Sequence, residues 1–198
     1  MLPNGVASKR VSKFYTRPGT TTLIALQINI LIMNNLHKFF LTTLCLMGLT
    51  IFHHFYASII YPQAFRAHVA YVSIPVVVLE YIIYREYRKA TNPLKKRLHY
   101  ILFQILAWSV PILLIGFYEG GYNHFLKNIL FFAGVKLNIL TDLFPPPMYE
   151  MPNNFIFEFT GILQFVTAIY ALLFLLRHYK EQNIVRSNGL RHISLNTN

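Results

Sequence analysis

Four long apolar segments alternate with short polar segments along the chain. Each apolar segment has about 18 to 22 residues, enough for a helix to cross the roughly 30 Å hydrocarbon core of a bilayer. They are residues 39–60, 67–84, 98–118 and 155–176. The pattern predicts an all-α integral membrane protein, built as an antiparallel four-helix transmembrane bundle.

The chain divides into three parts around these spans. Residues 1–38 form a basic N-terminal segment, residues 39–176 form the four-span membrane domain, and residues 177–198 form a basic tail. A further apolar run at 21–33 has only about 13 residues, which is too short to cross a bilayer. Met33 is an alternative start that would remove most of the first part.

The segment between the third and fourth spans needs separate treatment. Residues 122–140 carry too many polar side chains for a fifth span, and they are predicted to form an extra helix at the membrane interface. Gly120 and Gly121 are predicted to make the turn before this helix, because glycine accepts backbone conformations that other residues avoid. A proline-rich loop at 143–154 then leads to the fourth span.

Basic side chains are concentrated in three segments of the chain. Fifteen of the eighteen Lys and Arg residues lie in residues 1–38, 85–97 and 177–198. Loops rich in Lys and Arg remain in the cytoplasm. Both termini are therefore predicted to be cytoplasmic, with the protein in the inner membrane of a bacterium.

The composition agrees with a lipid environment. The chain is 55% hydrophobic and 13% charged, whereas a soluble domain carries about 25% charged residues. The net charge of +11 comes from basic residues between the apolar spans, so it indicates topology and not a nucleic-acid surface. The expected partners are the lipid bilayer and a lipid-like or amphipathic small molecule. Cys45 is the single cysteine, which excludes a disulfide within the chain and any CxxC metal motif.

Helical spacing predicts the buried faces of two spans. Small and polar residues recur along one face of each, and small side chains let membrane helices approach closely. The two stripes are Thr43, Met47, Thr50, His54 and Ser58, and Glu158, Gly161, Gln164, Ala168 and Ala171. Glu80, in the second span, is predicted to pair with Arg85, Arg88 or Tyr84.

Ionisable residues gather at the end of the bundle that this topology places outside the cytoplasm. Charged groups within membrane spans are costly and are typical of a bundle interior or a watery cavity. The residues concerned are His53, His54, His68, Glu119, His124 and Glu158. We therefore expect an outward-facing polar pocket.

Imidazole and carboxylate ligands from several helices are the chemistry of a divalent metal site. The predicted ligands are His54, His68, Glu119 and His124. Adjacent helical residues point about 100° apart, so His53 and His54 are not expected to bind one ion together. His54 is preferred because it continues the buried stripe. The alternatives are a b-type haem, with His54 and His68 as axial ligands, and a structural polar network.

The same residues also suit acid–base chemistry without a metal. The predicted catalytic groups are Glu119 and Glu158, with His124 and His54 assisting. The predicted substrate-binding residues are Arg66, Lys127, Asn123 and Tyr122. The sequence thus predicts a membrane-embedded enzyme for an amphipathic or lipid substrate. A small carrier and a non-enzymatic accessory membrane subunit are the alternatives.

Overall fold

The computed structural model describes residues 18–61 and 63–196, and its regular elements in this part of the chain are all helical. Within the described residues, four helices are long and apolar enough to cross a membrane. Their ranges are Asn35–Ile60, Phe65–Lys89, Pro93–Phe132 and Phe155–Val185. The all-helical class predicted from the sequence is confirmed, and the four long apolar helices support the prediction of an integral membrane protein. Residues 1–17, which hold four of the five Lys and Arg residues of the predicted basic N-terminal segment, lie outside the described residues.

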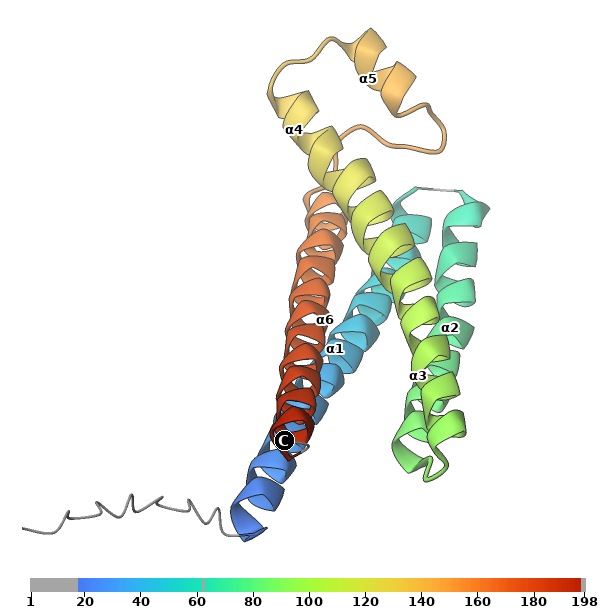
Figure 1. Ribbon diagram of the computed structural model, residues 1–198. Helices are drawn as coiled ribbons and strands as arrows, with labels where there is room; N and C mark the ends of the chain where they lie inside the picture. The colour runs from blue at the N-terminus through green and yellow to red at the C-terminus, as the bar shows by residue number, and fades with distance from the viewer. Residues whose placement is uncertain (1–17, 62, 197–198) are drawn as a thin grey trace, which may run out of the picture.

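Six α-helices and one helix with i→i+5 hydrogen bonding follow one another in the part of the chain that the structure describes (Figure 1). They are α1 (Pro18–Ile60), α2 (Ala64–Lys89), α3 (Pro93–Ala107), η1 (Trp108–Leu126), α4 (Lys127–Phe132), α5 (Leu137–Leu143) and α6 (Phe155–Asn196). α3, η1 and α4 follow without a break and form the third candidate span.

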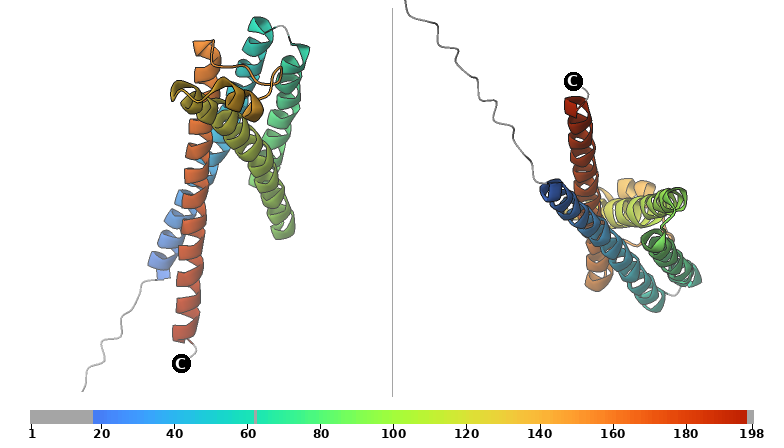
Figure 2. Two further views of the ribbon diagram at one scale, coloured as in Figure 1. Left: turned by 90° about the horizontal axis from the view of Figure 1, so that it is seen from above. Right: turned by 60° about the horizontal axis from the view of Figure 1, so that its bottom comes forward.

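α1 lies at the centre of the helix contacts, because it packs against α6, α2 and η1. α6 also packs along η1, and α2 packs against α3. The α1–α2 connection and the segment carrying α5 lie at one end of the molecule (Figure 1). α6 extends past the α2–α3 turn at the other end (Figure 2).

Local sequence signals explain where two of the helices begin. The Asn92 side chain accepts hydrogen bonds from the amides of Leu94 and Lys95, and Pro93 occupies the first turn of α3. Asn is a favourable N-cap and Pro is favourable at the first helical position. Asn154 accepts a hydrogen bond from the amide of Phe157 at the start of α6.

The predicted turn at Gly120 and Gly121 is wrong, because the helix continues through both residues to Phe132. Gly120 instead allows the backbone of η1 to pack closely against that of α6. A Cβ atom on Gly120 would lie 2.5 Å from the backbone nitrogen of Phe165 on α6. The chain turns later, at Gly134, whose φ of 77° favours glycine.

The separate interfacial helix predicted over 122–140 is also corrected. Its first half belongs to η1 and α4, and only the short α5 follows. The division of its faces is nevertheless as expected. His124, Lys127 and Asn128 are buried, and Phe125, Ile129 and Phe132 are exposed.

The predicted small-residue stripe of α6 is buried and meets η1 closely. A Cβ atom on Gly116 would lie 2.1 Å from the Cβ of Ala168. Gly116 and Gly120 form a GxxxG spacing, which allows close approach of membrane helices. This crossing brings the backbones of η1 and α6 together beside the polar residues of both.

Glu80 does not have the partners expected from the sequence. It is fully buried, and its Oε1 accepts a hydrogen bond from the Thr43 hydroxyl on α1 at 2.5 Å. Its Oε2 has no hydrogen-bond partner among the described residues. The basic residues near the α2 terminus therefore do not neutralise it by direct pairing.

Candidate functional site

Glu119 and His124 lie five residues apart on η1 and face one another. In an α-helix such residues would point about 140° apart. The i→i+5 bonding of η1 winds the chain less per residue, which brings positions five apart nearer to one face. Nε2 of His124 lies 3.5 Å from Oε1 of Glu119. The other Glu119 oxygen accepts a hydrogen bond from Nδ2 of Asn123 at 2.7 Å.

His53 approaches this pair from α1. Its Nδ1 lies 2.9 Å from Oγ1 of Thr160 on α6. The Thr160 hydroxyl has one proton, and the carbonyls of Ile156 and Phe157 lie 2.8 and 3.1 Å away to accept it. Oγ1 therefore accepts from Nδ1–H of His53, which leaves a lone pair on Nε2.

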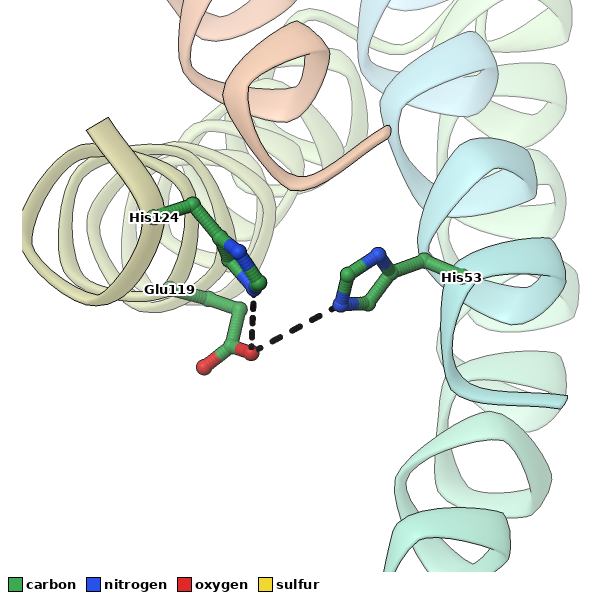
Figure 3. Close-up of side chains that lie close together, drawn as sticks. All are labelled: His53, Glu119 and His124. Carbon is green, nitrogen blue, oxygen red and sulfur yellow. Dashed lines mark ion pairs between the residues drawn. The ribbon is translucent and has the colours of Figure 1, made fainter. Parts of the chain in front are cut away.

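The three side chains converge on one point between α1 and η1 (Figure 3). One ligand atom from each of His53, Glu119 and His124 lies within 4.8 Å of the others. Oε1 of Glu119 stands between the rings, 4.0 Å from Nε2 of His53. Ligand atoms about 2.0–2.2 Å from zinc in a tetrahedron stand about 3.4 Å apart. A small inward movement of these side chains would complete that geometry.

Hydrogen bonds fix the second ring nitrogen of both histidines. Nδ1 of His124 lies 2.8 Å from Oε2 of Glu158 on α6, so Nδ1–H donates a hydrogen bond to the carboxylate. His124 therefore presents Nε2 to Glu119, as His53 does. A metal-binding histidine characteristically donates its other N–H to a carboxylate or another oxygen in this way.

Glu158 also receives two further hydrogen bonds behind the histidines. Nζ of Lys127 lies 3.0 Å from Oε1, and Nδ2 of Asn128 lies 2.5 Å from Oε2. All three side chains are buried. The paired charges and the amide donor hold the carboxylate, and with it the His124 ring, in one orientation.

A cavity of about 240 Å³ opens beside the three converging residues. Glu119, His124, His54, Asn123 and Lys127 contribute to its wall. Both ring nitrogens of His54 and Oδ1 of Asn123 are buried without a hydrogen-bond partner among the described residues. Nε2 of His54 lies 3.9 Å from Oε1 of Glu119. Unpaired buried polar atoms are costly, so these atoms favour a bound ion or water in the cavity.

Arg66 lines the same cavity from α2. Its Nε donates to the Gln63 side chain at 2.9 Å, and its Nη2 donates to Oε1 of Glu150 at 3.3 Å. Glu150 lies in the segment between α5 and α6, and its backbone carbonyl accepts from Nζ of Lys127 at 2.5 Å.

Tyrosines attach this segment and the end of α5 to the long helices. The Tyr118 and Tyr149 hydroxyls are hydrogen-bonded at 2.6 Å, and the Tyr122 hydroxyl donates to the carbonyl of Leu143. Burial raises the pKa of Tyr149. Burial, with Glu158 and Glu150 nearby, raises the pKa of Tyr61 to about 12, so its hydroxyl stays protonated and donates to Asn153.

The structure brings together most of the residues singled out in the sequence. His54, Glu119, Asn123, His124, Arg66 and Lys127 line the cavity, and Glu158 lies directly behind it. His68 does not join them: it is exposed on α2 and is not part of the metal-ligand group. Tyr122 bonds Leu143, the last residue of α5, and is not part of the cavity wall.

Sequence reasoning placed His53 in the polar pocket but not among the metal ligands, and it gave no role to Thr160 or Glu150. His53 was set aside because its neighbour His54 continues the buried stripe. Both histidines are buried because α1 has neighbours on two sides here. His53 lies against α6, and His54 faces the cavity. The ring of His53 is stacked on Phe157, with 4.5 Å between the ring centroids. The available signal was that two adjacent histidines, His53 and His54, lie a few residues before the end of the first span.

Comparison with protein-family models, with curated proteins and with solved structures gave no match.

Proposed function

We propose that the protein is a membrane-embedded metalloenzyme that binds one divalent cation, best suited to zinc, through His53, Glu119 and His124. The observation that carries the proposal is the convergence of these ligand atoms within 4.8 Å of one another. Two imidazoles and one carboxylate form a three-ligand set that catalytic zinc sites use, with water at the fourth position.

The surroundings of the three residues support a catalytic and not a closed structural site. Glu119 and His124 line the cavity, so a metal held by them is open to a small molecule there. A bound divalent cation lowers the pKa of its water and polarises a carbonyl or phosphoryl oxygen. The reaction class that follows is hydrolysis of an ester, amide or phosphate bond in an amphipathic substrate.

The cavity volume favours a metal ion over a haem. At about 240 Å³ it is smaller than the roughly 300–1,000 Å³ that cofactor and ligand sites occupy. His68, one of the two expected axial ligands, is exposed on α2. A metal-free hydrogen-bonded network remains the competing account, and the metal content decides between the two.

We also propose that the four spans form an antiparallel bundle in a bacterial inner membrane, with both termini in the cytoplasm. The distribution of Lys and Arg supports this orientation. It places the cavity at the end of the bundle away from the cytoplasm. The site would then act on substrates that reach it from the outer leaflet.

The proposal is tested by the metal content of the protein purified in detergent without chelators. We expect about one zinc per chain, retained through dialysis. His53→Ala and Glu119→Gln should each lose most of the metal. His99→Ala is the matched control, because His99 is half-buried on α3, away from the cavity, and among the described residues its ring bonds the carbonyl of Lys95 in its own helix.

Two outcomes would contradict the proposal. The wild-type protein could hold no divalent metal even after reconstitution with excess zinc. Alternatively, all three variants could retain the metal equally, which would place it elsewhere on the chain. In either case the His and Glu side chains form a structural polar network.

A further inference from the structure

We propose that the substrate carries an anionic group, a phosphate or a carboxylate, and that Arg66 binds it in the position where the Glu150 carboxylate now lies. The place of this group beside a metal rests on the proposed function. The binding of an anion by Arg66 stands on separate contacts, so each can fail without the other.

Arg66 is held rigidly in the cavity wall. It is 5% exposed, although it lies in the first turn of a candidate membrane span. Its guanidinium carbon lies 4.9 Å from the Tyr61 ring centre, 5.4 Å from that of Phe65 and 5.6 Å from that of Phe157. Three aromatic rings around a buried guanidinium fix its plane and reduce the entropy lost when an anion binds.

Partners among the described residues use only part of the guanidinium. Nε and Nη2 donate to Gln63 and Glu150, whereas a guanidinium has five N–H donors and matches carboxylate and phosphate with two parallel hydrogen bonds. The present contact with Glu150 runs through one Glu150 oxygen, Oε1, which also accepts from Gln63 at 3.1 Å. A ligand that engages two donors would bind more strongly than this contact.

Glu150, in the segment between α5 and α6, contacts both Arg66 and Lys127. Its carboxylate pairs with Arg66, and its backbone carbonyl accepts from Lys127. The Glu150 side chain is 26% exposed, whereas that of Arg66 is 6% exposed. The acid is therefore the member of the pair that can leave for solvent. An anion that enters the cavity takes its place on Arg66 and brings a nearby bond of the substrate toward Glu119 and His124.

The experiment measures stabilisation of the purified protein by anions. The probes are inorganic phosphate, and detergent micelles doped with phosphatidic acid or with diacylglycerol of the same acyl chains. We expect phosphatidic acid to raise the melting temperature more than diacylglycerol does. Arg66→Gln should abolish this difference, while Arg85→Gln, at an exposed arginine of the same helix, should retain it.

Glu150→Gln keeps the proposal testable if the Arg66 variant does not fold. Removal of the competing carboxylate should tighten phosphatidic acid binding about fivefold, the upper end of what the loss of a partly exposed ion-pair partner gives. An equal response to inorganic phosphate would identify a water-soluble anion, and a response to phosphatidic acid alone would identify a lipid headgroup. Both results support an anion site.

Repeating the measurement after chelator treatment separates this inference from the metal proposal. An Arg66-dependent response in metal-free protein supports the anion site even if no metal is ever bound. A response that disappears with the metal and is unchanged in Arg66→Gln would overturn the anion site and leave the metal proposal intact. Equal responses to phosphatidic acid and diacylglycerol would also overturn it.

Discussion

Nδ1 of His124 on η1 lies 2.8 Å from Oε2 of Glu158 on α6. This contact joins two helices that cross at small residues, and it aims the other ring nitrogen of His124 at Glu119, 3.5 Å away. A carboxylate behind a histidine fixes the tautomer and increases the basicity of the ligand. Glu158, which does not reach Glu119 itself, thus sets the orientation of the His124 ring that does.

Glu158→Gln should lower both stability and metal affinity. The change removes the counterion of Lys127, which is 1% exposed, and leaves its ammonium with neutral oxygen acceptors. Breaking one side of a buried ion pair costs about 3–5 kcal/mol, and loss of a second-layer carboxylate lowers metal affinity about 10- to 100-fold. Thermal unfolding in detergent and zinc titration measure the two effects.

The double variant Glu158→Gln/Lys127→Met provides the control for this prediction. Met keeps most of the volume of Lys and removes the stranded charge, so much of the stability should return while the metal affinity stays low. A Glu158→Gln protein as stable as the wild type would show that Lys127 does not depend on this carboxylate.

Gly161→Ala should displace the His124 ring. A Cβ atom at Gly161 would lie 2.1 Å from Cγ of His124, and the ring has no free space because Glu119 and Glu158 hold both nitrogens. We expect a loss of about 1–3 kcal/mol, the usual cost of overpacking, together with weaker zinc binding. Gly48→Ala is the matched control, because its Cβ would have no neighbour within 4 Å. Equal zinc affinity in the two variants would contradict the packing described for His124.

Glu80→Gln should change stability by less than about 1 kcal/mol. The amide oxygen can accept the Thr43 hydroxyl as the carboxyl oxygen does, and the second oxygen of Glu80 has no partner to lose among the described residues. Thr43→Val removes the donor and should cost about 1–3 kcal/mol. Chemical unfolding of both variants in mild detergent checks the order. A strongly destabilised Glu80→Gln would mean that the carboxylate is charged and paired.

Cysteine labelling tests the orientation in the membrane. Thr91→Cys lies in the α2–α3 turn and Asn138→Cys lies in α5, and both positions are exposed. In a background where Cys45 is replaced by Ala, an impermeant maleimide added to intact cells should label position 138 and not position 91. Labelling of both positions in intact cells, or of position 91 alone, would refute the proposed topology. These positions avoid Asn92 and Asn154, whose side chains cap helices.

The sequence predicts the membrane spans well because hydropathy and proline act locally. The first span ends at Ile60 and the fourth begins at Phe155, at the same residues as α1 and α6. The third span extends beyond its predicted end at residue 118. Gly120 and Gly121 gave a turn signal, but the close approach of α6 that gives Gly120 its role depends on tertiary packing.

The candidate site was predicted only in part, because its details also depend on tertiary packing. Topology alone placed His54, Glu119, His124 and Glu158 at one end of the bundle, because each lies near the same end of its span. The choice between His53 and His54 depends on the rotation of α1 relative to α6. That rotation is visible in the bond from His53 to Thr160, and no periodicity in a single helix specifies it.

The most direct test of the account is X-ray absorption at the zinc edge of the reconstituted protein. We predict four-coordinate zinc with two imidazoles and oxygen ligands, which becomes a one-imidazole site in His53→Ala under forced loading. His54→Ala should retain the wild-type spectrum, because His53 and His124 supply the two nitrogens. No zinc edge at one equivalent per chain, or the loss of an imidazole in His54→Ala but not in His53→Ala, would contradict the proposed metal centre.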